Sequence, residues 1–463
     1  MQKDNQPVSL HVKLAILGLA GLAFCGVLIE TSMNVTFPTL MQQFSISLNK
    51  VQWLTTAYLL LVAATISIAA FIEKRFIFKK IFFWAGLLFI IGVICSALAP
   101  NFLILLIGRL IQALSTGLAI PLLITEIMQQ IPQKKQGSYM GIGGMVIALA
   151  PSLGPTYGGV ITQDLSWRLI FWFVLPVGLI AWLIGLSFIE QKSSPSKIPF
   201  AWKQFISLIL ALLSITVAVN NAGIYGWTSI KFYGFLLIAV ILLIVFIKLS
   251  TNSRQALISI SLFKKWEFVC PLLIYFLIQF IQLSLTFLLP NYAQLILKKG
   301  VMISGIMLLC GSLISAILQP LTGRMLDSFS VKIPLVIGAF FLITSTTSFI
   351  IFQRYLSVFL IAALYVIYMI GFSFVFNNSL TYALQKLPLK LISDGNAVFN
   401  TLQQYAGSLG TSVASALLAN GIGTDGKQSN YTGSRHIFIL NFISCAIVVI
   451  LIFSIQRKKN KYN

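Results

Sequence analysis

Two charged residue types lie well inside long apolar runs of this sequence, away from the ends of the runs. The apolar residues around them have no side-chain group that could bind or transfer a proton. Glu30 lies deep in the first such run, and Arg109 lies in the fourth. A charged group in an apolar medium is costly and indicates a functional site by default. A low dielectric favours the protonated form of a carboxyl group, which can then exchange a proton near neutral pH. Glu30 is therefore the candidate group for proton exchange, because a cation bound beside it would favour the charged form and expel the proton.

Both residues also have a purely structural interpretation. Glu30 could pair with Arg109, or with amide groups near the ends of the apolar runs, and simply hold the fold together. A guanidinium group does not deprotonate in proteins, so Arg109 is better suited to anchoring or tuning a carboxylate than to carrying a proton. The residue types alone leave both interpretations of Glu30 open.

Further polar side chains recur at helical spacing along the apolar runs. Residues three or four apart lie on the same face of a helix. Asn34 therefore shares a face with Glu30, and the face of Arg109 continues through Gln112 and Thr116. Two later runs carry similar stripes, formed by Gln279, Gln282 and Thr286 and by Asn400, Gln404 and Ser408. Since each stripe avoids lipid only by facing inward, we expect the stripes to line one polar cavity with aromatic walls.

The stretch ALAPSLGPTYGGVI (148–161) places glycine and proline inside an apolar run. These are the two residue types that cost a helix most. In a membrane, small residues let helices approach closely, and neighbouring groups can satisfy the carbonyls that a proline frees. By itself, the stretch therefore predicts a kinked, tightly packed helix.

The composition indicates which elements position these residues. Only 9% of the 463 residues are charged, whereas a soluble domain carries about 25%. A span needs about 20 apolar residues, and the runs lack the alternation of barrel strands. The sequence therefore predicts an all-α polytopic membrane protein. Fourteen runs are expected to span the membrane: 13–37, 51–73, 81–99, 102–126, 138–161, 167–189, 204–222, 232–249, 268–296, 301–323, 333–352, 355–377, 396–419 and 436–455.

The net charge is +22, with 32 Lys and Arg against 10 Asp and Glu. On a soluble protein this would suggest nucleic-acid binding. When the loops are assigned alternately to two sides, most basic residues fall on the side of both termini, which the positive-inside rule identifies as the cytoplasm. We therefore expect a multi-pass protein of the cell membrane with cytoplasmic termini and no nucleic-acid partner.

The runs divide into groups of six, two and six. The longest connections on the cytoplasmic side, about 190–203 and 249–267, bracket two runs with few polar residues. AAFIEKRFIFKK (69–80) and LTGRMLDSFSVK (321–332) each end the second run of a six-run group. Paired halves are typical of transporters, with a site near the bilayer midplane between them. The expected domains are a six-helix bundle (1–190), a two-helix insert with cytoplasmic linkers (191–266) and a second six-helix bundle (267–463).

Several stretches, in order and spacing, resemble the fourteen-span drug:proton antiporter branch of the major facilitator superfamily, the multidrug efflux type. GPTYGG (154–159) resembles its antiporter motif, and LIETSMNVTFP (28–38) resembles its first-span signature, with Glu30 where Asp is usual. Similar stretches are VQWLTTAYLL (51–60), GRLIQALSTG (108–117), WRLIFWFVLPVG (167–178), LFKKWEF (262–268), LLPNYAQ (288–294), TGRMLD (322–327) and NAVFNTLQQYAGSLGT (396–411). The resemblance covers nearly the whole chain and implies the major facilitator fold with 14 transmembrane helices. It also implies that the antiporter motif forms a dry seam between two moving halves, since irregular helices are common at transport seams. The candidate seam residues are Gly141, Gly154, Pro155, Gly158 and Gly159.

The resemblance also implies a cytoplasmic gate, and here the sequence departs from the family. Gly323 and Asp327 match the second-half copy of the gate motif. The first-half copy keeps basic character through Arg75, and Glu73 stands one position from the usual Asp. The family's Gly, Asp and Gly are replaced by Ala70, Lys74 and Ile77. Glu73 could substitute for the lost acid, gating could be altered, and Asp327 could be a solvated charge at a helix end.

By resemblance, we expect a proton-coupled secondary active transporter that exports amphipathic toxic compounds or drugs by alternating access. Its driving force would be the proton gradient, with no bound cofactor, and its partners would be small-molecule substrates, protons and membrane lipid, with the chain acting as a monomer. The alternatives are an exporter of one specific metabolite, peptide or antibiotic, an importer on the same scaffold, or a non-transporting membrane receptor or immunity protein. The altered first gate copy is the only support for the last of these.

The sequence holds no sign of enzymatic chemistry. It lacks the GxxxxGK[ST] loop of ATP-driven pumps. His11 and His436 lie far apart and predict no metal site, and the five cysteines fall in predicted spans at spacings that match no metal or redox motif. We therefore expect no enzymatic or metal-dependent activity.

Overall fold

The computed structural model describes residues 8–190, 200–251, 260–328, 332–420 and 426–459. Within these ranges it leaves out some side chains in helices, chiefly at 133–148, 320–328, 389–393, 426–430 and 456–459. In these ranges the chain forms helices and no strands. The helices are α1 (Leu10–Phe44), α2 (Leu48–Val51), α3 (Trp53–Arg75), α4 (Phe78–Ala97), α5 (Phe102–Gln130), α6 (Gln133–Asp164), α7 (Arg168–Phe188), α8 (Trp202–Tyr225), α9 (Ile230–Thr251), η1 (Ile260–Lys264), α10 (Trp266–Leu295), α11 (Val301–Ser328), α12 (Lys332–Ile351), η2 (Gln353–Tyr355), α13 (Val358–Gln385), α14 (Leu389–Asn420) and α15 (Gly426–Lys459). The all-α prediction is confirmed.

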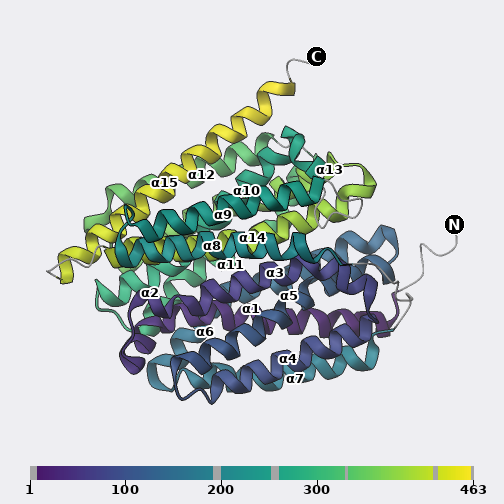
Figure 1. Cartoon of the computed structure of the whole chain (residues 1–463), viewed down its shortest axis with the longest axis horizontal. Coiled ribbons are helices and arrows are strands. Elements are labelled where there is room, and N and C mark those ends of the chain that lie inside the picture. Colours follow the sequence, from purple (N-terminus) through teal and green to yellow (C-terminus); the bar gives the residue numbers. More distant parts are fainter. Residues whose placement is uncertain (1–7, 191–199, 252–259, 329–331, 421–425, 460–463) are drawn as a thin grey trace.

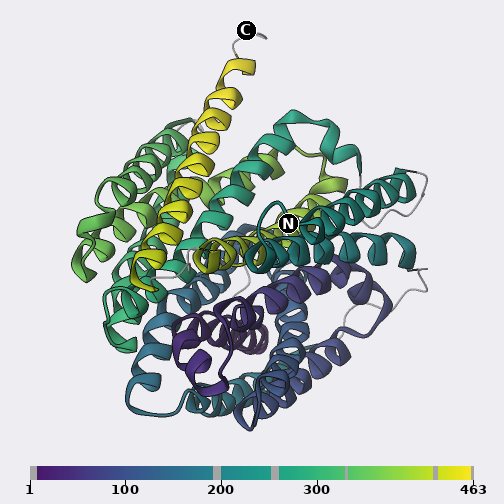
Figure 2. The same ribbon diagram turned by 60° about the vertical axis from the view of Figure 1, so that its left-hand side comes forward.

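Two groups of helices lie side by side, α1–α7 in the lower part of Figure 1 and α10–α15 in the upper part. The same separation is visible after the turn to Figure 2. Neighbours correspond between the groups. Helix α1 packs against α5, α6 and α7 as α10 packs against α13, α14 and α15, and α4 packs against α5 and α7 as α12 packs against α13 and α15. We call the two groups the N-terminal and C-terminal halves.

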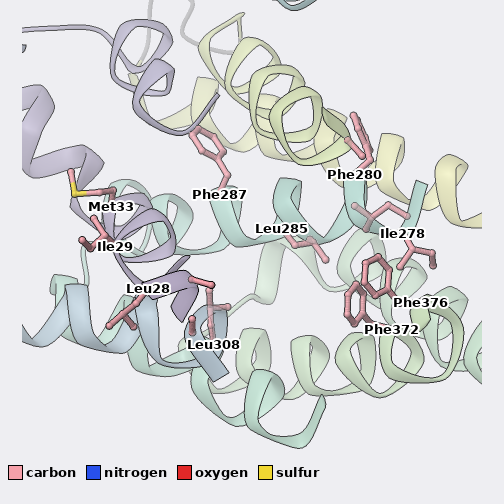
Figure 3. Packing of buried hydrophobic residues seen from close by; sticks show 14 of the residues in the cluster. Leu28, Ile29, Met33, Ile278, Phe280, Leu285, Phe287, Leu308, Phe372 and Phe376 are labelled. Atoms are coloured by element: carbon pink, nitrogen blue, oxygen red, sulfur yellow. The ribbon is translucent and has the colours of Figure 1, made fainter. Parts of the chain in front are cut away.

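The halves meet chiefly along two helix pairs, α6 with α11 and α3 with α14. The pairs are equivalent, because α3 and α11 are the second long helices of their halves and α6 and α14 are the fifth. Between them α1 touches α10, where the rings of Phe37 and Phe287 have centroids 6.0 Å apart. Figure 3 shows the hydrophobic core running from Leu28 of α1 past Phe287 to Phe372 and Phe376 of α13. The core is thus continuous between the halves.

Helices α8 and α9 pack on each other, and α8 packs on α14 and α3. Trp53 Nε1 of α3 donates to Asn220 Oδ1 of α8 over 3.2 Å. Tyr405 of α14 donates its hydroxyl to the Leu212 carbonyl oxygen over 3.2 Å. Helix α9 leaves most of its large hydrophobic side chains exposed. The α8–α9 pair therefore covers the outer side of the α3–α14 contact, and α9 presents an apolar surface suited to lipid.

Within the described residues, twelve helices are long and apolar enough to cross a membrane. The chain is therefore a multi-pass membrane protein. Helices α6 and α14, each 32 residues long, are not among the twelve. Both carry many glycines and polar residues, which lowers the mean hydropathy of any window within them. The predicted count of fourteen spans and the 6+2+6 arrangement thus go beyond what length and composition support.

Some helix ends differ from the sequence-based expectation. The sequence predicts a loop over 420–435, but α15 already begins at Gly426. Helix α6 continues unbroken through Pro151 and Pro155, so the prolines do not interrupt it. A helix satisfies its own backbone groups, and it can therefore extend past the apolar segment that determines its place in the membrane.

Candidate functional site

A cavity of about 350 Å³ lies between the two halves. Helices α1, α3, α5 and α6 line it on one side, and α10, α11, α13 and α14 line it on the other. Its lining runs from Glu30 and Thr116, midway along α1 and α5, to Ile127 and Leu380 near the ends of α5 and α13. Those ends lie on the side of the molecule where α1 starts and α15 finishes (Figure 1). The cavity therefore extends toward the side of the chain termini.

Glu30 is the acidic residue of the cavity lining. Its side chain is 6% exposed, and its Oε1 atom has no hydrogen-bond partner in the described chain. The charges of Glu30 and Arg109 interact, yet the two form no direct ion pair among the described residues. A buried carboxyl oxygen without a partner is costly unless it binds a proton or a ligand. The geometry thus favours the functional interpretation of Glu30 over a simple ion pair.

Arg109 lies behind the cavity wall, fully buried between α3, α4 and α5. Its guanidinium carbon lies 4.1 Å from the ring centroid of Tyr58, a cation–π contact. Its Nη1 donates to Gln112 Oε1 over 2.6 Å, and Gln112 Nε2 donates to Ser96 Oγ over 3.2 Å. Its Nε and Nη2 have no hydrogen-bond partners in the described chain. Arg109 therefore acts on the cavity through Tyr58, which lines it, and through its charge.

The two walls of the cavity differ in chemistry. The N-terminal wall offers one carboxyl group, a few hydroxyls and an aliphatic surface, whereas the C-terminal wall offers uncharged amides and aromatic rings. The aliphatic residues are Val27, Leu59, Val62, Ile66, Ile120, Leu123, Ile124 and Ile127. The amides are Gln279, Gln282, Gln319, Asn377, Asn400, Gln403 and Gln404. An apolar pocket with a few polar groups is typical of small-molecule sites, and here the polar groups are concentrated on one wall.

Several of these amides bond to neighbours within their own half. Tyr275 donates its hydroxyl to Gln403 Oε1 over 2.8 Å, and Asn377 Nδ2 donates to Gln319 Oε1 over 3.3 Å. Gln282 Nε2 donates to the Tyr365 hydroxyl over 3.0 Å, while Gln282 Oε1 is buried without a partner among the described residues. The amide layer is thus held in place, and the buried Oε1 of Gln282 in the cavity wall is left without a donor among the described residues.

The predicted cavity stripes are partly realised. Gln279, Gln282, Asn400 and Gln404 line the cavity together with Glu30. Asn34 does not, and this part of the prediction is wrong. Thr55 Oγ1 of α3 donates to Asn34 Oδ1 over 2.8 Å, because α3 covers that turn of α1. Arg109 and Gln112 likewise lie outside the lining.

Sequence reasoning missed other lining residues, among them Gln319, Asn377, Gln403 and the aromatic residues Tyr58 and Tyr275. Gln319 lies inside the predicted run 301–323, and Asn377 ends the predicted run 355–377 next to Asn378. An amide inside such a run is itself a signal, since a polar group at membrane depth needs an inward-facing partner.

The predicted seam residues of α6 face two different helices. A Cβ on Gly154 would lie 1.9 Å from Thr31 Oγ1, and a Cβ on Gly158 would lie 2.5 Å from the Ser32 carbonyl oxygen, so these glycines contact α1 within the N-terminal half. A Cβ on Gly159 would lie 2.8 Å from the Val301 carbonyl oxygen of α11. Only part of the motif thus lies between the halves. Gly141 also lies in α6, but its surroundings are outside the described residues.

The contact between α6 and α11 is made backbone to backbone. A Cβ on Gly305 of α11 would lie 2.1 Å from the Pro155 carbonyl oxygen. Nearby, Gln163 Oε1 accepts from the Met302 backbone N–H over 3.3 Å. We call this contact the glycine seam. It lies toward the end of the molecule away from the termini.

The equivalent contact between α3 and α14 is made by hydroxyl groups. Thr56 Oγ1 lies 3.1 Å from Thr411 Oγ1 and 2.9 Å from Ser412 Oγ, and it also donates to Gln52 Oε1. Ser408 Oγ donates to the Thr56 carbonyl oxygen over 2.9 Å. We call this contact the hydroxyl seam. It also lies toward the end away from the termini.

The predicted gate lies at the opposite end. Glu73 accepts a hydrogen bond at Oε2 from Thr125 Oγ1 of α5 over 2.7 Å, so it joins two helices of one half. Arg75 is exposed at the end of α3. The positive charge of Lys74 acts on Asp394 near the start of α14, where partial burial raises the pKa of the carboxyl and Lys74 opposes the rise. The side-chain surroundings of Gly323 and Asp327 lie outside the described residues.

Comparison with known proteins identifies the relatives of this chain. A sequence model of the Major Facilitator Superfamily matches residues 19–411. The lincomycin resistance protein LmrB of Listeria monocytogenes is 32% identical over 94% of this chain and 95% of its own length. The protein of the same name from Bacillus subtilis is 32% identical over 99% of this chain and 98% of its own length. A crystal structure of a POT family transporter in complex with a thioalcohol-conjugated peptide aligns with a TM-score of 0.72 and 15% identity over 95% of each chain, a likeness of fold.

Proposed function

The chain belongs to the Major Facilitator Superfamily, and we propose that it is a proton-coupled exporter of amphipathic toxic compounds or drugs. It is a membrane transporter and not an enzyme. Export of drugs is supported by the relatives named for lincomycin resistance, which match it over nearly their whole length. Proton coupling rests on a single observation, the buried carboxyl of Glu30 in the cavity between the halves.

The proposed coupling is a competition for one carboxylate. When Glu30 is protonated, the described lining of the cavity carries no charge, since the other described lining residues include no Asp, Glu, Lys or Arg. A cationic substrate binds better to the ionised form, so its arrival expels the proton. The proton gradient then re-protonates Glu30 from the other side and releases the substrate. Arg109 and Tyr58 tune the carboxylate from behind the wall.

We propose the following arrangement for the whole protein. Helices α6 and α14 also cross the bilayer, which gives fourteen spans in a 6+2+6 order. The protein lies in the plasma membrane of the cell, and both of its termini are in the cytoplasm. The cavity is then open toward the cytoplasm, and the glycine and hydroxyl seams close its outer end. Alternating access would open these seams and close the cytoplasmic end near Glu73 and Asp394. The protein works as a monomer, and the proton gradient replaces any bound cofactor.

The test compares wild type with Glu30→Gln in drug efflux from energised cells, with and without a proton uncoupler. The panel holds lincomycin, lipophilic cations and neutral drugs. We expect uncoupler-sensitive efflux in wild type and its loss in Glu30→Gln at equal protein level. Glu190→Gln is the matched control, because Glu190 is exposed and pairs with His11 over 3.6 Å, away from the cavity. Proton-coupled efflux that survives in Glu30→Gln would remove Glu30 as the carrier.

A dedicated exporter of one antibiotic is the second candidate, and the relatives' names favour it. The amide-rich C-terminal wall is consistent with a substrate that has many hydrogen-bonding groups. Efflux of lincomycin alone from the same panel would favour this candidate over a multidrug exporter. Efflux of several unrelated compounds would favour the broader function.

A further inference from the structure

Two buried acceptor atoms of cavity-lining residues have no hydrogen-bond partner in the described chain, one from each half. They are Oε1 of Glu30 in α1 and Oε1 of Gln282 in α10. The side chains are 6% and 9% exposed, and both residues line the cavity. Helices α1 and α10 touch each other, so a ligand in this one cavity lies beside both side chains, and a small side-chain rotation would turn either oxygen toward it. Buried acceptors without partners are costly, and the two atoms therefore share a need for a donor.

The orientation of the Gln282 amide is fixed by its neighbours. The hydroxyl group of Thr286 donates a hydrogen bond to the backbone carbonyl oxygen of Gln282 over 2.9 Å. Thr286 Oγ1 can then only accept, which it does from Gln282 Nε2 over 3.5 Å. The same Nε2 donates to the Tyr365 hydroxyl over 3.0 Å. With both amide hydrogens used on this side, the side-chain oxygen of Gln282 is presented as an acceptor.

The pair of acceptors distinguishes two kinds of organic cation. A protonated primary, secondary or tertiary amine carries at least one N–H donor and one positive charge. A quaternary ammonium ion carries the charge but no N–H donor, so it leaves Gln282 Oε1 unpaired. A site built to receive a donor discriminates strongly against an analogue that lacks it. Charge alone, acting through Glu30, would not separate the two.

The aromatic side of the cavity presents the opposing possibility. Tyr275 and Phe376 stack with ring centroids 4.0 Å apart, and Phe372 stacks on Phe376 at 4.6 Å. All three line the cavity. Aromatic faces attract quaternary ammonium ions as well as N–H cations. If these rings dominated recognition, the cavity would accept both kinds of cation equally.

We propose that the cavity selects protonated amines that carry at least one N–H, with the ammonium hydrogen donated to Gln282 Oε1 and the charge neutralised by Glu30, and that it disfavours quaternary ammonium ions. The aliphatic N-terminal wall takes the alkyl part of the substrate, and the amides of the C-terminal wall take its neutral hydrogen-bonding groups. This inference rests on the proposed function, since it names the substrate class of the same cavity.

The test is a binding measurement on the purified full-length protein in lipid nanodiscs at pH 7.5. The probes are radiolabelled verapamil, a tertiary amine, and N-methylverapamil, its quaternary derivative. Both carry one positive charge at this pH and share their skeleton. We expect wild type to bind verapamil at least about tenfold more tightly, as one hydrogen bond to a charged group supports. Empty nanodiscs correct for partition into lipid.

Gln282→Leu removes the acceptor at similar size, and we expect its preference for verapamil to fall to within about twofold. Gln404→Leu, at another amide of the same cavity, should change both affinities together and keep the ratio. Should Gln282→Leu fail to fold, Tyr365→Phe replaces it. That change removes the hydroxyl that orients Gln282 and is expected to reduce the ratio.

Equal affinities in wild type, or an unchanged ratio in Gln282→Leu and Tyr365→Phe, would overturn the inference. So would binding of neither probe. The proposed function is judged separately, because uncoupler-sensitive efflux of drugs in the Glu30 experiment does not depend on this ratio. A protein that exports drugs but binds both cations equally would retain its proposed function and lose the proposed selectivity.

Discussion

Where α6 meets α11, a Cβ on Gly305 would lie 2.1 Å from the Pro155 carbonyl oxygen. Where α3 meets α14, hydroxyl side chains fill the space, and Thr56 Oγ1 lies 2.9 Å from Ser412 Oγ. The two contacts occupy equivalent positions in the two halves, yet one is made by backbone and the other by side chains. Related halves have therefore solved the same packing problem in two ways.

The difference has a mechanical consequence. Backbone atoms in contact through glycine cannot shift past each other without separating the helices, and proteins pack too densely to absorb such a shift. Hydroxyl groups rotate and can both donate and accept. A small sliding of α3 along α14 can exchange one hydroxyl partner for another, as the cluster of Thr56, Thr411 and Ser412 allows. We expect the glycine seam to be all-or-none and the hydroxyl seam to tolerate change.

The largest effect should come from Gly305→Ala in the glycine seam. Its added methyl group meets a backbone oxygen of Pro155 and not a flexible side chain, so α6 and α11 must separate. Overpacking of this kind costs about 1–3 kcal/mol. We expect transport to be lost and the seam to open, and a cysteine introduced at Val301 should then react with a membrane-impermeant maleimide.

Gly234→Ala is the control for this prediction. Gly234 lies in α9, and a Cβ there would meet no atom within 4 Å among the described residues. If Gly305→Ala transports normally and the cysteine at position 301 still does not react with the maleimide, the glycine seam is not a rigid closure.

An intermediate effect is expected from Thr56→Val in the hydroxyl seam. Valine keeps the shape of threonine but removes the hydroxyl that contacts Thr411 and Ser412. Interhelical hydrogen bonds in membranes contribute about 0.6 kcal/mol on average, so we expect a fall of about 1 kcal/mol in stability, read as a lower unfolding temperature in detergent, with transport retained.

Thr344→Val is the matched control, since Thr344 is only half-buried and donates to the Phe340 carbonyl oxygen of its own helix over 2.7 Å. The double variant with Ser412→Ala should cost less than the sum of the two single changes. Loss of transport in Thr56→Val would contradict the tolerance assigned to the hydroxyl seam.

These two seams also mark what the sequence could and could not predict. GPTYGG stands out because it concentrates glycine and proline, the two residue types that cost a helix most. The sequence therefore predicts close packing at the glycine seam, but it does not predict that Gly154 and Gly158 contact α1. The hydroxyl seam was not visible. Thr56 and Ser412 are small polar residues, and the hydroxyl group of such a residue often donates to a backbone carbonyl oxygen of its own helix. No spacing rule links two residues that lie so far apart in the chain.

The cavity repeats this lesson. Glu30 is evident from the sequence, because a carboxyl group is costly inside an apolar run and usually marks a functional site there. Asn34 lies four residues further along the same face, yet α3 covers it and Thr55 occupies its oxygen. The free acceptor of Gln282 depends on Tyr365, a residue of another helix. Periodicity identifies the face of a helix, whereas the neighbour that covers each turn is fixed by tertiary packing.

The smallest effect is predicted for Gly407→Ala in α14, one residue before Ser408 of the hydroxyl seam. Its added methyl group would approach Leu283 Cγ at 3.1 Å and Leu59 Cδ1 at 3.2 Å, both side-chain atoms that can move by a few tenths of an ångström. We expect transport near the wild-type level and an unfolding temperature within a few degrees of wild type. The same substitution in Gly305 and in Gly407 thus separates the two seams directly. Equal losses of transport in Gly305→Ala and Gly407→Ala would show that both seams are rigid. The two seams would then differ in the groups that form them but not in their tolerance of movement.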